Sequence, residues 1–93
     1  MLTVIAYDIV DDRRREAVST LLADHGRRVN YSVFECDLEG KEFEHLQAHL
    51  ARLIDHRQDR IVLYRLCEGC RARKSAIGCA ATDDGWHQSV VIV

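Results

Sequence analysis

The order of the apolar runs along the chain constrains the fold most strongly. Residues 2–9 form a short apolar run rich in strand-forming side chains, which is too brief for a helix and predicts a buried strand. A helical pattern of apolar residues follows over about residues 12–25, and Gly26 supplies the signal that ends it. Residues 28–38 alternate β-branched and aromatic side chains, which predicts either one long strand or a bent pair.

The second part of the chain repeats this order. Apolar residues recur at helical spacing over about residues 41–56, and a run of strand formers follows at 60–66. Residues 67–87 include glycines and predict a loop, and residues 89–93 predict a last strand. This order is that of the ferredoxin-like α+β fold, βαββαβ, in which two helices cover one face of an antiparallel sheet, here with an additional C-terminal strand.

The length of 93 residues predicts a single ferredoxin-like domain over residues 1–93. A chain of this size buries only a little over about half of the surface that it exposes when unfolded, which suffices for one modest core but not for a deep active-site cleft. The short apolar strand at the C-terminus carries little information about its own register. We expect residues 88–93 to be exchanged with, or packed on, a second copy, which gives a two-fold homodimer.

The compartment follows from two further features of the sequence. No segment approaches the roughly 18 consecutive apolar residues of a membrane span, and the N-terminus lacks the positive region of a signal peptide. We therefore expect a cytoplasmic protein with no membrane partner. Cysteines stay reduced in the cytoplasm, which favours free thiols or metal ligands over disulfides.

The three late cysteines are candidate zinc ligands. Cys67 and Cys70 have a spacing familiar from zinc sites, and Cys79 with His87 would complete the set. The later spacings are irregular, so free thiols in a loop are the alternative. Cys36 stands alone on a predicted strand and is expected to be a small buried hydrophobic residue.

Basic residues are clustered, although the net charge of −2 argues against a uniformly basic nucleic-acid binder. Arginine side chains match phosphate oxygens, and each phosphate that is neutralised adds to DNA affinity. The clusters therefore predict nucleic-acid contacts, with a solvated helix surface as the alternative for Arg13 and Arg14. The candidate nucleic-acid-binding residues are Arg13, Arg14, Arg27, Arg28, Arg71, Arg73 and Lys74.

Asp8 is the candidate metal ligand because it follows an apolar strand and so lies at the rim of the predicted sheet. Its oxygen atoms suit Mg²⁺ or Mn²⁺. One aspartate is a poor site, but two copies across a dimer axis, with water completing the shell, would hold one ion that orients a phosphodiester and activates a water molecule. The alternative is that Asp8 caps the following helix or stabilises a turn.

Three segments carry a resemblance to a known family. They are Tyr7-Asp8-Ile9, the sequence Tyr-Ser-Val-Phe-Glu at residues 31–35, and residues 60–70. Together they resemble the small CRISPR-associated adaptation nuclease family, the Cas two family, over nearly the whole chain. The resemblance implies a ferredoxin-like homodimer that binds DNA beside a CRISPR integrase during spacer acquisition. It also implies metal-dependent endonuclease activity on RNA or DNA, as in some members.

The resemblance assigns residues to these roles. Asp8 would be the catalytic and metal-binding acid, with Mg²⁺ or Mn²⁺ as the cofactor. The supporting positions are Tyr7, Arg15, Arg28, Ser32 and Phe34. Asn30 departs from the glutamine that members often have there, which shortens the reach of the amide. We expect Phe34 in the core or the dimer interface, because an aromatic residue on a short strand is more often packed than stacked on a base.

Two other functions fit the same pattern. One is a small ferredoxin-like regulatory or zinc-binding assembly module without catalysis, because a fold alone does not fix a function. The other is a toxin-like ribonuclease of the same fold.

Overall fold

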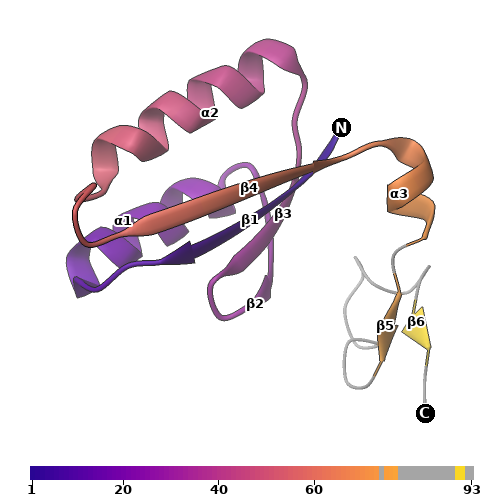
Figure 1. The fold of residues 1–93 in the computed structure, drawn as a ribbon, viewed down its shortest axis with the longest axis horizontal. Helices are drawn as coiled ribbons and strands as arrows, with labels where there is room; N and C mark the ends of the chain where they lie inside the picture. The colour runs from indigo at the N-terminus through magenta and orange to yellow at the C-terminus, as the bar shows by residue number, and fades with distance from the viewer. Residues whose placement is uncertain (74, 78–89, 92–93) are drawn as a thin grey trace.

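The structure is a computed structural model that describes residues 1–73, 75–77 and 90–91. Its elements follow the predicted order along the chain (Figure 1). They are β1 (Leu2–Asp8), α1 (Asp12–Ala23), β2 (Gly26–Asn30), β3 (Val33–Asp37), α2 (Gly40–Leu53), β4 (Arg60–Leu66), α3 (Glu68–Ala72), β5 (Ala76–Ile77) and β6 (Val90–Val91). Within the described residues, no helix has the length and apolar character needed to cross a membrane.

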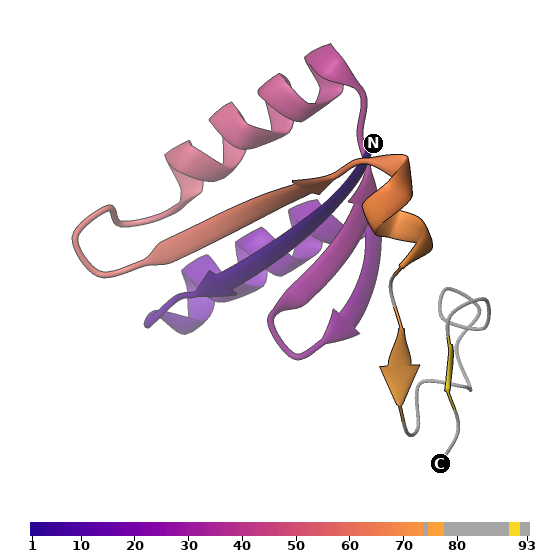
Figure 2. The ribbon, with the colours of Figure 1, turned by 45° about the vertical axis from the view of Figure 1, so that its right-hand side comes forward.

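The strands β1 to β4 form one antiparallel sheet in the order β2-β3-β1-β4. The helices α1 and α2 pack on the same face of this sheet, as Figures 1 and 2 show from two directions. This arrangement confirms the predicted ferredoxin-like fold. It also places β1 between two neighbours, so that the end of β1 lies in the middle of one rim of the sheet.

An apolar core joins the two helices to the sheet. Strand side chains alternate between the two faces, and in β1 this alternation directs Ile5 and Tyr7 toward the helices. The helices contribute residues three or four positions apart, as the amphipathic patterns predict. The buried cluster comprises Ile5, Tyr7, Ile9, Val18, Leu22, Phe34, Cys36, Leu38, Leu46 and Leu50.

The segment 28–38 is a bent pair rather than one long strand. β2 and β3 pair as an antiparallel hairpin whose register shifts between Arg28 and Asn30. The side-chain oxygen of Asn30 accepts a hydrogen bond from the amide of Tyr31 at 2.7 Å. The Asn30 side chain therefore contributes one hydrogen bond at the turn of the hairpin.

The other face of the sheet carries a second apolar surface. Directly opposed residues share a face, so Val4 lies beside Tyr64, and Ala6 lies between Val33 and Val62. Val4, Ala6, Val33 and Val62 are half-buried, whereas Tyr64 is 56% exposed. We call these five residues the open face, because α1 and α2 lie on the opposite side of the sheet.

Residues 67–87 are not a continuous loop, contrary to the expectation from the sequence. Residues Glu68–Ala72 form α3, in which the Arg71 amide donates a hydrogen bond to the Cys67 carbonyl oxygen at 2.9 Å. Residues Ala76–Ile77 then form β5. The hydrophobic pattern of the sequence does not predict α3, because a five-residue helix that contains glycine has no apolar periodicity.

The predicted C-terminal strand is present as β6 at Val90–Val91. It pairs in parallel with β5 of the same chain, with Val90 opposite Ala76 and Val91 opposite Ile77. The flanking residues 88, 89, 92 and 93 lie outside the described residues. The exchange of residues 88–93 with a second copy stays a prediction, as does the single domain over residues 1–93.

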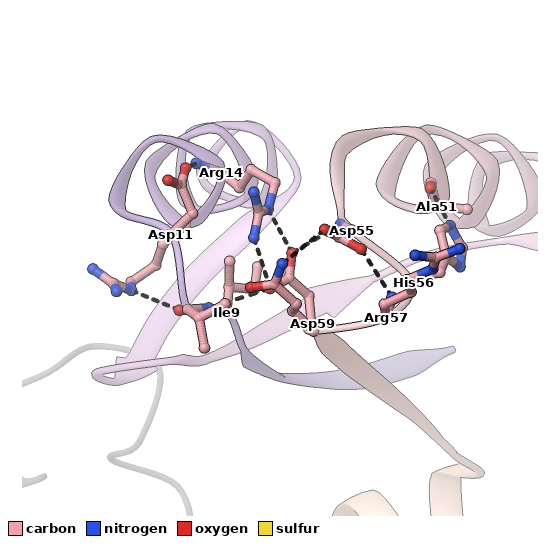
Figure 3. Close-up of polar contacts among 11 residues, drawn as sticks. Ile9, Asp11, Arg14, Ala51, Asp55, His56, Arg57 and Asp59 are labelled. Atoms are coloured by element: carbon pink, nitrogen blue, oxygen red, sulfur yellow. Dashed lines mark hydrogen bonds and ion pairs between the residues drawn. The ribbon is translucent and has the colours of Figure 1, made fainter.

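A buried carboxylate ties the start of α1 to the connection between α2 and β4. The Asp59 side chain is fully shielded from solvent. Its oxygens accept hydrogen bonds from Nε of Arg14 at 2.7 Å and from the amides of Asp55 at 2.9 Å and Val10 at 3.2 Å (Figure 3). This network fixes the chain that follows Asp8.

The variant Asp59→Asn should lower the melting temperature at neutral pH by on the order of 10 °C. The hydrogen bond from Arg14 holds the pKa of Asp59 at about 2, below its usual value of 3.8. A depressed folded-state pKa means that ionised Asp59 stabilises the fold above about pH 4, and that this contribution is lost as the pH falls toward about 2. Thermal unfolding at several pH values measures both effects.

The exposed acid Asp24 provides the control, since Asp24→Asn should leave the melting temperature nearly unchanged. The difference between wild type and Asp59→Asn should shrink below about pH 4. A constant difference down to about pH 2 would contradict the assigned charge pairing.

Candidate functional site

Asp8 ends β1 on the same side of the sheet as the open face. It lies opposite Arg60, the first residue of β4, and both side chains are exposed. Within the described residues, the Asp8 carboxylate forms no hydrogen bond or ion pair. The cap of α1 is Asp11, whose carboxylate accepts from the Arg14 amide at 2.9 Å, so the alternative of Asp8 as the helix cap is wrong. Asp8 is therefore available to a ligand.

Asp8 lines a surface hollow of about 390 Å³ together with several predicted site residues. The lining residues are Tyr7, Asp8, Ile9, Arg15, Tyr31 and Ser32. A second hollow, of about 530 Å³, shares Tyr7, Arg15 and Tyr31 with the first and adds Arg28. The structure thus gathers Asp8 and four of its five predicted supporting residues at one end of the sheet.

Arg15 is held over this hollow by two hydrogen bonds. Its Nε donates to the carbonyl oxygen of Ile9 at 3.2 Å, and its Nη1 donates to Asp12 Oδ1 at 2.6 Å. The Arg15 side chain is 45% exposed and that of Asp12 is 91% exposed, so the ion pair is screened by water and contributes little to stability. The guanidinium can therefore exchange Asp12 for an incoming phosphate oxygen.

Phe34 contacts two of the residues that line these hollows, Tyr7 and Arg28. It is buried in the core, and its ring lies 6.3 Å from that of Tyr7 in a stacked arrangement. The guanidinium carbon of Arg28 lies 5.4 Å from the centroid of the Phe34 ring, and its Nη2 donates to the Ser19 hydroxyl. A cation over an aromatic face is stabilised by the ring quadrupole. Phe34 therefore positions Tyr7 and Arg28.

Ser32 contributes its backbone to the same end of the sheet. The amide of Tyr7 donates to the Ser32 carbonyl oxygen at 3.0 Å, which extends the pairing of β1 with β3 into the hairpin turn. This bond sets the turn residues Tyr31 and Ser32 beside the end of β1.

The remaining cations occupy different surroundings. Arg13 lines a groove between α1 and α2, away from Asp8, and Arg73 is exposed directly after α3. Arg27 stands opposite Glu35 in the β2–β3 ladder. Lys74 lies outside the described residues.

Two of the predicted nucleic-acid contacts are already paired with acids. Arg14 is bound to the shielded Asp59, and Arg71 Nη1 lies 3.3 Å from Asp37 Oδ2. A phosphate would compete with Asp59 for Arg14, at the cost of leaving a shielded carboxylate unpaired. The exposed pair of Arg71 with Asp37 opens more readily.

A single copy offers an incomplete metal site at Asp8. Among the described residues, no three His, Cys, Asp or Glu side chains are grouped so that they could hold a metal ion. The Asp8 oxygens are of the donor type that Mg²⁺ and Mn²⁺ prefer, but one carboxylate leaves the rest of the coordination shell to other molecules. The residues fit such an ion only if a second copy supplies another carboxylate.

The cysteines divide into one buried thiol and one exposed pair. Cys36 is buried, as the sequence predicts, and its burial raises the pKa of this thiol to about 11. Cys67 and Cys70 are exposed free thiols at the N-cap and in the first turn of α3. Cys79 and His87 lie outside the described residues, and zinc binding by Cys67, Cys70 and Cys79 stays a prediction.

The sequence did not single out two residues of this site. Tyr31 is 86% exposed and lines both hollows. The signal for Tyr31 in the sequence is an aromatic residue at the possible bend within the predicted strand 28–38. Arg60 stands opposite Asp8, and only the register of β4 against β1 reveals this.

Comparisons with known proteins agree with the fold. The family model described as CRISPR associated protein Cas2 matches residues 1–74. A relative from Chloroflexus aurantiacus named CRISPR-associated endoribonuclease Cas2 3 is 46% identical over 91 residues, which cover 97% of this chain and 98% of the relative. A protein from Thermus thermophilus named CRISPR-associated endonuclease Cas2 2 is 44% identical over 68% of this chain and 70% of its own length.

A solved structure supports the same family and fold. The crystal structure of Streptococcus pyogenes Cas2 at pH 6.5 superposes with a TM-score of 0.75 at 31% identity, covering 84% of this chain and 100% of that one. The match extends over β1, where the Tyr7-Asp8-Ile9 segment lies, and the resemblance predicted from the sequence is confirmed. The chain belongs to the Cas2 family of CRISPR-associated proteins.

Proposed function

We propose that this protein is a homodimeric, metal-dependent endonuclease of CRISPR adaptation that binds DNA beside an integrase partner in the cytoplasm. The observation that carries the proposal is the Asp8 carboxylate, which has no hydrogen bond or ion pair to any described residue and lies in a hollow with Arg15 at the end of the central strand β1. The relatives named endoribonuclease and endonuclease support cleavage of a phosphodiester bond.

The open face supports a dimer. Its apolar side chains stand on the side of the sheet away from α1 and α2, and Tyr64 is 56% exposed. An apolar sheet face gains free energy when a second sheet covers it. If two copies pack these faces about a two-fold axis that passes near the end of β1, the two Asp8 carboxylates approach each other.

A dimer would supply the second carboxylate that a single copy lacks. The Asp8 carboxylates of the two copies would hold one Mg²⁺ or Mn²⁺ ion, which when bound supplies a Lewis acid that activates a water molecule for attack on phosphorus. Arg15 lies over the same hollow and would bind a phosphate oxygen. Tyr31 and Ser32 line the hollow and would orient the bound strand.

The nucleic acid would be held by the exposed cations beyond this hollow. Arg28 lines the adjoining hollow, and Arg73 follows α3 with an exposed side chain. Contacts of this kind neutralise phosphates without reading the base sequence. They suit a protein that binds duplex DNA during spacer acquisition, and they also admit RNA as a substrate.

The test is cleavage by the purified full chain. Single-stranded RNA and duplex DNA are incubated with the protein in Mg²⁺, in Mn²⁺ and in EDTA, and the products are resolved by electrophoresis. We expect cleavage with either metal and none in EDTA. Equal cleavage with and without metal would contradict the metal-dependent assignment.

The dimer has its own prediction. The variant Ala6→Glu places a charge in the middle of the open face, where a covering sheet would bury it without a partner. We expect the dimer to dissociate into folded monomers, as measured by light scattering and circular dichroism. The matched control is Ala48→Glu on the exposed side of α2, which should leave the dimer intact. Dimers of unchanged stability in Ala6→Glu would exclude the open face as the interface.

A further inference from the structure

The Cys67–Cys70 pair is the most chemically reactive group that the proposed function does not use. Both thiols are exposed; Cys67 is the N-cap of α3, and Cys70 lies in its first turn. The Arg71 amide donates to the Cys67 carbonyl oxygen at 2.9 Å, which fixes this turn as helical. Residues three apart on such a turn have Cα atoms about 5 Å apart, within the range of about 4.4–6.8 Å that a disulfide spans.

The two sulfur atoms already interact. The thiol of Cys70 lies close enough to that of Cys67 for each group to shift the pKa of the other. A methyl group at Gly69 would lie 3.9 Å from the Cys67 sulfur, so the turn passes close beneath it.

This mutual interaction shifts the two pKa values in opposite directions. Donation from the Cys70 backbone, followed by that from its thiol, lowers the pKa of Cys67. The hydrogen bond to Cys67 raises the pKa of Cys70. The thiolate is the nucleophile in thiol–disulfide exchange, so Cys67 would attack first and Cys70 would resolve the intermediate.

We propose that Cys67 and Cys70 form a redox-responsive dithiol, which closes to an intramolecular disulfide by exchange with low-molecular-weight disulfides such as oxidised glutathione. The Cys67 thiolate attacks one sulfur of the disulfide and forms a mixed disulfide, and one thiolate leaves. Cys70 then loses its proton and attacks Cys67, which releases the second thiol and forms the Cys67–Cys70 bond. The protein is oxidised by two electrons, and the small disulfide is reduced to two thiols.

A disulfide between Cys67 and Cys70 would constrain the contact that α3 makes with the end of β3. Arg71, the next residue after Cys70, pairs with Asp37, and Asp37 also binds the N-terminal amine of Met1 at 3.0 Å. The oxidised turn would hold Arg71 in place beside β3. The reduced turn leaves this exposed contact free to open.

The experiment uses the full chain carrying Cys79→Ser, so that only the pair and Cys36 remain. The protein is equilibrated with oxidised glutathione, excess thiols are alkylated, and the intact and peptide masses are measured. We expect the loss of two hydrogen atoms, located in the peptide that contains Cys67 and Cys70. Cys36 is the internal control, because its buried thiol should remain unmodified.

Two variants separate the roles. Cys70→Ser should accumulate a stable glutathione adduct on Cys67, whereas Cys67→Ser should react at least about tenfold more slowly. Three outcomes would overturn the proposal: no loss of hydrogen in excess oxidised glutathione, equal reaction rates in the two variants, or disulfides that form only between two copies. Stoichiometric zinc that survives purification of the wild-type chain and is lost in Cys70→Ser would also overturn it in favour of a zinc site.

Discussion

Replacement of Asp8 with alanine should reduce metal-dependent cleavage by about 100-fold or more, because the variant removes the carboxylate that would hold the metal beside the phosphodiester. The fold should be unaffected, since the Asp8 side chain is exposed and forms no hydrogen bond within the described residues. Cleavage of labelled RNA and duplex DNA in Mg²⁺ measures the first effect, and circular dichroism and light scattering check the second.

The matched control is Asp24→Ala, which removes an exposed acid from the C-terminal end of α1. This variant should cut as fast as wild type. If Asp8→Ala also cuts at the wild-type rate, then the carboxylate is not the metal ligand and the nuclease assignment fails.

The same variant separates catalysis from a scaffold role. Spacer insertion by the integrase partner, measured with wild type and Asp8→Ala in parallel, should persist if the protein serves there mainly as a DNA-binding dimer. Loss of cleavage with retained insertion would place function in the basic residues rather than in Asp8. Loss of both would make the cleavage step part of adaptation.

Replacement of Gly26 with alanine should destabilise the fold by about 3 kcal/mol. A Cβ atom at this position would lie 2.1 Å from the Glu35 carbonyl oxygen and 2.8 Å from the Cys36 Cα, both of which are backbone atoms of β3. The backbone of β3 is held by β2 and β1 on its two sides, so it cannot yield without disturbing the sheet. Urea unfolding followed by circular dichroism should show a lower midpoint with an unchanged slope.

Gly40→Ala is the control for this substitution. Gly40 begins α2, and a Cβ atom there would meet nothing within 4 Å. Alanine should therefore be neutral, or stabilise the helix by up to about 1 kcal/mol. Equal midpoints for the two variants would show that β3 does not approach Gly26 as closely as described.

Several site residues could be predicted because they depend on local pattern or on family resemblance. Asp8 follows an apolar strand, and the Tyr-Ser-Val-Phe segment marks the hairpin that carries Ser32 and Phe34. Arg15 and Arg28 came from the resemblance, and the structure brings both to the hollows beside Tyr7. The roles of these residues in cleavage stay predictions.

Other features depend on contacts between distant parts of the chain and could not be predicted. Arg14 lies within the same basic cluster as Arg15, yet it pairs with Asp59, 45 positions later. Tyr31 acquires its place in the hollow only when the hairpin folds beside the end of β1. Nothing in the local sequence distinguishes Arg14 from the other arginines of its cluster.

The sequence by itself determined the order of strands and helices and the ferredoxin-like fold, because hydrophobic periodicity is a local property that each segment carries alone. The tertiary structure alone decided the strand register that sets Asp8 opposite Arg60, and the helix packing that sets Arg15 over the same hollow. Register and packing are choices among pairings of remote segments, and their free energies arise only when the segments meet.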